Sequence, residues 1–248
     1  MAVSAVFLAG CQGATSGGSS PAPTASENYA ALDAQQLQSK REQLAAPGAP
    51  QAKVVASIAA MLEPVVTKDY NNTPFGYYVE KEPDPDAESY YGPRVYISVG
   101  MVDFADNREE VAGVLCHESA HVLHYDGINS DQTTNTWNNK VAALIARHHG
   151  VYARVVNKLA SFSELRYTRK QESDADKAGA TICDHAHINP WGLVWMLRKL
   201  QQKYPTSRLS YLSDHPSNQT RISALVSYLR HNSEFQVWPA DEKFATKK

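Results

Sequence analysis

The chain has 248 residues, 43% of them hydrophobic, with 24 basic and 26 acidic side chains. This apolar fraction is enough for one domain core. The balanced net charge does not indicate a polyanion-binding surface, although it leaves a local basic patch open, so nucleic acid is not an expected partner. Three cysteines are too few for a disulfide scaffold. We expect Cys116 to be a buried free thiol, and pairing with Cys183 in an oxidising compartment is the alternative.

The N-terminus is predicted to be a targeting segment rather than part of the folded domain. Residues 1–10 resemble the end of a signal peptide and are too short to span a bilayer. Residues 8–11, LAGC, resemble a bacterial lipobox, in which Cys11 would be acylated. The next residue, Gln12, resembles the sorting residue of outer-membrane lipoproteins. No Lys or Arg precedes the apolar run, so a chance cysteine in a disordered tail is the alternative. Residues 11–26, rich in Gly, Ser, Ala and Pro, are predicted to be a flexible tether.

The rest of the chain predicts an α+β fold that is mainly α, with a small sheet. Its domain is expected over 27–240, followed by a polar tail at 241–248. Apolar spacing and turn residues predict, in chain order, helices at 27–44 and 51–62, strands at 76–80 and 94–99, and helices at 107–125, 137–149, 151–167, 170–183, 190–203 and 216–230. Pro64 predicts a stop soon after the second helix, and the Pro- and Asp-rich residues 82–86 predict a solvated loop.

The predicted helix at 107–125 contains an HExxH match, in which His117 and His121 lie one turn apart on one face. Both imidazoles can then bind one zinc ion, and Glu118 can act as the general base toward a water molecule. The alternative is a surface helix with two unrelated histidines. The apolar flanking residues favour burial instead, and a buried Glu between two buried His residues is costly unless a metal or hydrogen bonds compensate it.

A catalytic zinc normally has a third protein ligand. The metzincin pattern is excluded because positions 124 and 127 are His124 and Gly127, the reverse of what that class requires. His124 is therefore expected to be structural or exposed. Glu172 and Asp176 lie four apart on a predicted helix, so one can bind the metal while the other accepts a hydrogen bond from a ligating histidine. A solvated acidic patch is the alternative for this run.

HExxH followed about fifty residues later by ESDAD resembles the gluzincins related to HtpX, Oma and the CAAX prenyl proteases, above all the soluble bacterial lipoprotein branch that includes LoiP and BepA. The similarity runs from about residue 95 to 229. It implies a zincin-like fold with a central HExxH helix, one zinc per chain, Glu172 as the third ligand and Asp176 behind the ligands. The stretch at 88–93 departs from the edge strand of the family, so substrate positioning by strand addition is expected to differ.

The sequence DHPS at 214–217, followed by Arg221, resembles the His-Pro-Ser plus Arg element of the same family. The resemblance implies that His215 lies near the metal, either stabilising the oxyanion or occupying a fourth zinc position in a self-inhibited state. Arg221 would lie behind the site, paired with Asp176.

The function that the resemblance implies is a zinc metalloendopeptidase for cell-envelope proteins, with misfolded outer-membrane proteins as candidate substrates. The enzyme would be periplasmic and lipid-anchored to the outer membrane. The alternatives are a chaperone-like or latent binding factor whose site is closed by His215, and a zinc hydrolase acting on a non-peptide bond.

Overall fold

The computed structural model describes residues 29–70, 72–127, 167–204, 209–215 and 219–235. The predicted signal end, lipobox, tether and C-terminal tail lie outside the described residues, as do the helices predicted between 137 and 166. The described part is mainly helical with one small sheet, which confirms the predicted α+β class. None of its helices is long and apolar enough to cross a membrane.

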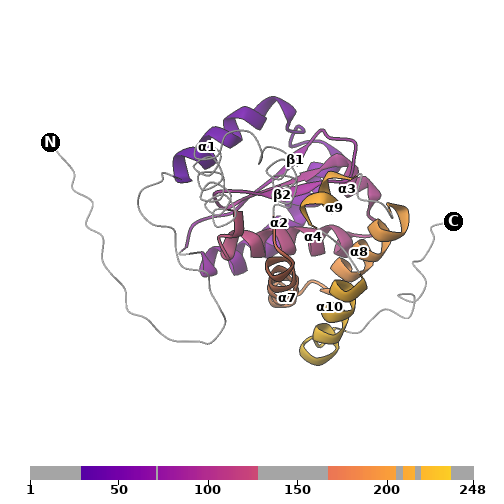
Figure 1. Cartoon of the computed structure of the whole chain (residues 1–248). Coiled ribbons are helices and arrows are strands. Elements are labelled where there is room, and N and C mark those ends of the chain that lie inside the picture. Colours follow the sequence, from indigo (N-terminus) through magenta and orange to yellow (C-terminus); the bar gives the residue numbers. More distant parts are fainter. Residues whose placement is uncertain (1–28, 71, 128–166, 205–208, 216–218, 236–248) are drawn as a thin grey trace, which may run out of the picture.

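The elements follow one another as Figure 1 shows. They are α1 (Tyr29–Lys40), the short 3-10 helix η1 (Arg41–Gln43), α2 (Pro50–Asp69), β1 (Gly76–Glu80), β2 (Ala87–Ser89), β3 (Arg94–Ser98), α3 (Val99–Phe104), α4 (Arg108–Leu123), α7 (Arg169–His185), α8 (Trp191–Lys203), α9 (Ser210–Asp214) and α10 (Gln219–Asn232). The two predicted strands match β1 and β3. The short elements α3, α9 and β2 were not predicted, because three to six residues are too few to show a period.

The sheet has the order β1-β3-β2, with β1 parallel and β2 antiparallel to β3. The outer side of β1 is covered by the chain after η1, through an isolated bridge between Leu44 and Glu80. On the other edge, Ser89 ends β2 opposite Val95. The edge strand therefore overlaps only the start of the stretch at 88–93, and it carries Ser89 toward α4.

The second helix is longer than the sequence predicted, since α2 continues through Pro64 to Asp69. The expected stop near Pro64 is wrong. Val55, Ile58, Leu62 and Val66 are buried at helical spacing on both sides of the proline, while Pro64 itself is exposed. Packing of this continuous apolar face outweighs the backbone hydrogen bond that proline removes, and the missing bond lies on the solvent side.

Helix α4 runs through the middle of the molecule, between the sheet on one side and α7 on the other (Figure 1). The side chain of Asn107 caps its start by accepting a hydrogen bond from the amide of Glu110 at 2.9 Å. Every residue from Glu110 to Val122 is buried. This all-round burial agrees with the strongly apolar flanks of the HExxH motif, and it puts the motif inside the protein.

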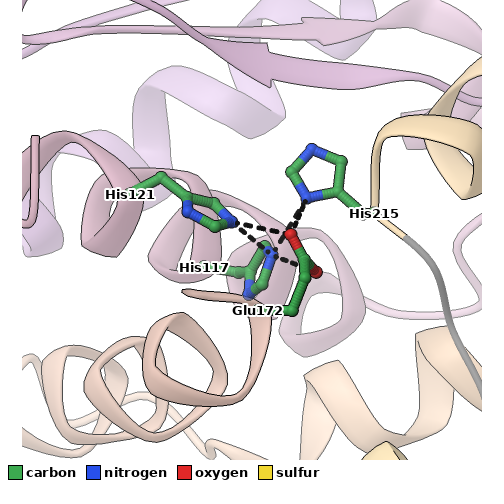
Figure 2. Close-up of side chains that lie close together, drawn as sticks. All are labelled: His117, His121, Glu172 and His215. Carbon is green, nitrogen blue, oxygen red and sulfur yellow. Dashed lines mark hydrogen bonds and ion pairs between the residues drawn. The ribbon is translucent and has the colours of Figure 1, made fainter. Parts of the chain in front are cut away.

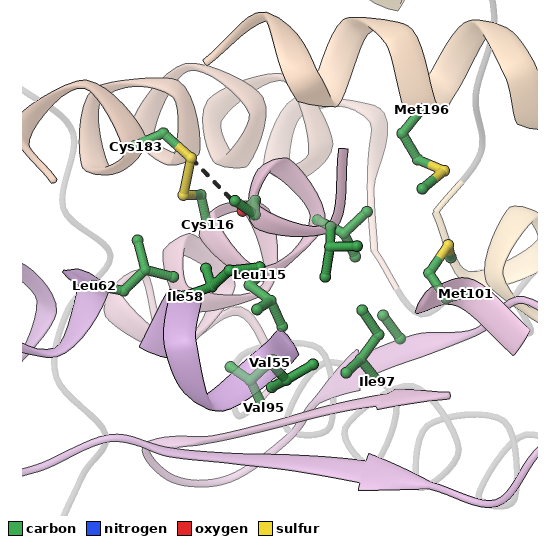
Figure 3. Packing of buried hydrophobic residues seen from close by; sticks show 14 of the residues in the cluster. Val55, Ile58, Leu62, Val95, Ile97, Met101, Leu115, Cys116, Cys183 and Met196 are labelled. Carbon is green, nitrogen blue, oxygen red and sulfur yellow. Dashed lines mark hydrogen bonds between the residues drawn. A yellow bond between two sulfur atoms is a disulfide. The ribbon is translucent and has the colours of Figure 1, made fainter. Parts of the chain in front are cut away.

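A disulfide joins Cys116 of α4 to Cys183 of α7 in the apolar cluster beneath the motif (Figure 3). The expectation that Cys116 is a free thiol is therefore wrong. The two Cα atoms are 5.9 Å apart, within the range that a disulfide requires. The helices can approach this closely because Gly179 has no side chain; a Cβ there would lie 2.9 Å from the Cα of His117. Sequence spacing contains no such distance.

Candidate metal centre

Four side chains from three segments converge between α4 and α7 (Figure 2). His117 and His121 project from successive turns of α4, Glu172 from the first turn of α7, and His215 from the residue after α9. All four are buried, and one nitrogen or oxygen atom from each lies within 4.8 Å of the others. The fold thus joins residues that are up to 98 positions apart in sequence.

The spacing of these atoms fits a small metal ion. The Nε2 atoms of His117 and His121 are 3.1 Å apart. The Nδ1 atom of His215 lies 3.3 Å from His117 Nε2 and 3.0 Å from Glu172 Oε1, which is itself 3.2 Å from His121 Nε2. Four atoms arranged tetrahedrally at zinc–nitrogen distances of 2.0–2.1 Å lie about 3.3 Å from one another. The residues present therefore match a tetrahedral site.

The chemistry of the two imidazoles points the same way. The Nδ1 atom of His117 lies 3.1 Å from Asp176 Oδ1, and that of His121 lies 2.8 Å from Asp126 Oδ2. Each carboxylate favours the proton on Nδ1, which leaves the lone pair of each Nε2 facing the other. When both imidazoles are neutral, two buried lone pairs 3.1 Å apart repel unless a proton or a metal ion lies between them. The site is therefore built for a cation.

A second set of contacts fixes the two carboxylates behind the histidines. Arg221 binds Asp176 with two parallel hydrogen bonds, of 2.6 Å from Nε and 2.7 Å from Nη2, and its Nη1 contacts Glu172 Oε2. Asp126 accepts a hydrogen bond of 3.1 Å from Gln171. The bidentate geometry holds Asp176 in one orientation, which in turn orients His117.

The charges in this cluster shift the protonation of its members. Burial would lower the pKa of His117, but the nearby carboxylates of Asp176 and Glu172 outweigh it and raise the pKa to about 9. Burial would raise the pKa of Glu172, but His215 and Arg221 hold it well below its usual range. Glu172 thus remains ionised, and a metal ion that binds at His117 would replace a proton.

Glu118 lies beside the four converging side chains. Its Oε1 atom is 3.4 Å from His215 Nε2, and its Oε2 atom accepts a hydrogen bond of 3.2 Å from the hydroxyl of Ser89. Burial opposes ionisation of Glu118, but the positive fields of His215, His117 and His121 lower its pKa. An ionised carboxylate next to a cation site is the arrangement that a general base requires.

The structure brings together the residues that the sequence singled out. His117, His121, Glu172 and His215 converge, and Asp176 and Arg221 pair behind them. His124 stands outside this group, half-buried and 3.8 Å from Asp126, while the predicted lipidation site Cys11 lies outside the described residues.

Among the residues near the centre that the sequence did not single out are Asp126, Ser89 and Tyr167. Asp126 reaches back to His121 because Tyr125 adopts a left-handed φ of 56° just after the helix. No spacing rule marks such a turn at a tyrosine. Tyr167 stacks on the ring of His121, with centroids 3.9 Å apart and planes at 9°. A pattern of aromatic residues alone could not have separated this tyrosine from core residues.

Comparison with known proteins agrees with the geometry. The model of peptidase family M48 matches residues 49–229. The chain belongs to peptidase family M48. This membership confirms the predicted resemblance to a family of metal-dependent peptidases. The matched region includes α4, which carries the HExxH motif, and all four converging side chains.

Several curated relatives share this region at low identity. The chain is 24% identical over 163 residues to the beta-barrel assembly-enhancing protease of Escherichia coli O157:H7 and 25% identical to that of Yersinia pestis, covering 61% of this chain and 34% of each relative. It is 24% identical over 178 residues to the mitochondrial metalloendopeptidase OMA1 of Schizosaccharomyces pombe, covering 67% of this chain and 52% of that protein. The chain thus spans from a third to about half the length of these relatives.

Proposed function

We propose that this M48 peptidase is a zinc-dependent endopeptidase in which His117, His121 and Glu172 hold the zinc. The observation that carries the proposal is the pair of facing Nε2 atoms, 3.1 Å apart, each oriented by its own carboxylate. Glu172 Oε1 approaches the same point and is kept ionised by Arg221 and His215. Two nitrogens and one carboxylate oxygen are a usual donor set for a catalytic zinc.

The residues around the zinc position have separate tasks. Zinc bound there would supply a Lewis acid that acidifies water and polarises a peptide carbonyl. The carboxylate of Glu118 accepts the proton of the attacking water and delivers it to the leaving amine. Asp176 and Asp126 keep the imidazoles of His117 and His121 in the tautomer that presents Nε2.

We infer that His215 closes the fourth position in the described conformation. Its Nδ1 atom faces the other ligand atoms, its Nε2 atom faces Glu118, and Tyr211 stacks on its ring at 4.7 Å. A peptide carbonyl requires that position, so the enzyme is latent until His215 withdraws. After withdrawal, the imidazole can donate a hydrogen bond to the oxyanion. The same closure supports the second candidate function, a chaperone-like or latent binding factor.

We also propose a location and a substrate class. The domain at 27–240 would be tethered through residues 11–26 to a lipid on Cys11, and would face the periplasm from the outer membrane. The buried disulfide between Cys116 and Cys183 supports this location, because such bonds persist in oxidising compartments. Several relatives are named for enhancing beta-barrel assembly, which supports misfolded outer-membrane proteins as substrates.

The decisive experiment replaces Glu118 by Gln in the purified, zinc-loaded chain and measures cleavage of an unfolded protein. We expect at least a hundredfold loss of kcat with one zinc per chain retained, because Gln cannot accept the proton. Glu63→Gln, at an exposed site on α2, is the matched control and should cleave normally. Equal cleavage by both variants, or no cleavage by either the wild type or His215→Ala, would sink the peptidase proposal.

Two further variants separate the roles of the ligands. Glu172→Ala should weaken zinc binding strongly, and unchanged affinity would refute its assignment. His215→Ala distinguishes a latent enzyme, in which it raises activity, from an enzyme that needs the histidine for the oxyanion, in which it lowers activity.

A further inference from the structure

The edge strand β2 reaches the proposed general base through Ser89, its last residue. The Ser89 side chain is buried, and its hydroxyl donates to Glu118 Oε2 at 3.2 Å. The other oxygen, Oε1, faces Nε2 of His215 at 3.4 Å and has no hydrogen-bond partner among the described residues. The Glu118 carboxylate is thus held by a strand on one oxygen and faces an imidazole with the other.

The backbone of Ser89 is itself tied to a metal ligand. Its carbonyl accepts a hydrogen bond of 3.0 Å from the hydroxyl of Tyr167. The Tyr167 ring lies flat on the imidazole of His121. Ser89 also stands opposite Val95 in the antiparallel pairing with β3. Three different contacts therefore fix where the Ser89 hydroxyl points.

We propose that Ser89 is a positioning residue for Glu118 and that Tyr167 sets its distance from the metal ligand His121. This inference rests on the proposed function of Glu118 as the base. A serine hydroxyl has one proton to donate, so it holds Oε2 in place and leaves the lone pairs of Oε1 available for the proton of water. Without Ser89, the carboxylate is free to rotate onto the imidazole of His215.

The effect of losing this contact follows from the tolerance of catalytic geometry. Catalytic groups need to be held to about 0.5 Å, and a displacement of about 1 Å can cost a hundredfold in rate. Ser89→Ala should therefore lower kcat by about ten- to a hundredfold, with KM and zinc affinity within twofold of the wild type. Tyr167→Phe keeps the ring stack but loses the hydroxyl, and should lower kcat less.

A matched pair of variants separates positioning from simple core packing. Thr and Val have nearly the same shape, but only Thr has a hydroxyl. Ser89→Thr should keep most of the activity that Ser89→Val loses. Equal kcat values for the Thr and Val variants would overturn the inference, as would wild-type kcat for Ser89→Ala.

Two controls keep this test distinct from the test of the proposed function. In the Glu118→Gln background, Ser89→Ala should cause no further loss, because the positioned base is already gone. If Glu118→Gln retains full activity, the proposed function fails; if only Ser89→Ala does, the positioning role fails alone. Crystal structures give a readout that is independent of activity: in Ser89→Ala, the Glu118 carboxylate should turn toward His215, and an unmoved carboxylate contradicts the inference.

Discussion

Among the described residues, one cation faces two carboxylates in several clusters, and two of these clusters differ clearly in burial. The arginine cluster lies behind the metal centre and consists of Arg221, Asp176 and Glu172. The lysine cluster joins α1 to the sheet and consists of Lys40, Glu80 and Glu88. The charges are the same in sign and number, but the surroundings differ, so the pair shows what burial does to an ion pair.

In the arginine cluster the three side chains are 5%, 2% and 1% exposed, and the guanidinium binds one carboxylate with two parallel hydrogen bonds. In the lysine cluster the exposed fractions are 17%, 12% and 14%. Water still reaches the second cluster, which weakens each charge's effect on its neighbours. We therefore expect the arginine cluster to dominate both stability and site geometry, and the lysine cluster to contribute modestly.

The largest expected effect comes from Arg221→Met, measured by urea unfolding of the metal-free protein. This change leaves two buried carboxylates without their cation, so the free energy of unfolding should fall by about 3–5 kcal/mol. Arg230→Met, at an exposed position on the same helix, is the control and should leave stability almost unchanged. Similar losses in the free energy of unfolding for both variants would show that burial does not determine how much each arginine stabilises the fold.

A smaller effect, on zinc affinity, is expected for a buried carboxylate that faces a metal-binding histidine but is not paired with an arginine. Asp126→Asn replaces the charged acceptor behind His121 by a neutral amide, which lowers the basicity of the imidazole. Zinc affinity, measured by competition with a chelator, should fall about ten- to a hundredfold. Asp174→Asn is the control, since Asp174 pairs with an exposed lysine on the solvent side of α7. An affinity loss no greater than that of the control would remove Asp126 from the metal centre.

The parts of the site that the sequence could predict are those that lie within one helix or strand. His117, Glu118 and His121 follow from helical spacing within one motif, and β1 and β3 follow from their composition. Helical spacing made Glu172 and Asp176 candidates, but resemblance to a family was needed to choose Glu172 and to place His215, because the fold that joins them to α4 crosses many residues. A spacing rule covers only neighbours within one element.

What the sequence missed depends on local geometry or on the approach of two elements. Asp126 reaches its histidine through a left-handed turn at Tyr125, and Ser89 reaches Glu118 through the register of a three-residue strand. The disulfide of Cys116 requires a distance between two helices that a glycine in α7 makes short. Helix α2 passes Pro64 because packing on the far side of the helix outweighs a local stop signal.

The smallest effect tests the lysine cluster itself. Lys40→Met should lower the free energy of unfolding by about 1 kcal/mol, since partly exposed pairs contribute little. Burial raises the pKa of Glu80 even with Lys40 beside it, which shows that desolvation offsets much of the attraction. Lys170→Met is the control: its ion pair with Asp174 is exposed, and stability should not change measurably. A loss as large as that of Arg221→Met would contradict the role given to burial.

The pH dependence of the same difference gives a second check. Burial would lower the pKa of Lys40, but hydrogen bonds and attraction from Glu80 and Glu88 raise it above 10.5. A cation whose pKa is higher in the folded state stabilises the fold fully below its unfolded pKa, and that contribution is lost as the pH rises through the folded pKa. The stability difference between the wild type and Lys40→Met should therefore stay constant near neutral pH and shrink above about 10.5. A difference that stays constant above that pH would show that the contribution of Lys40 comes from packing of its aliphatic chain and not from its charge.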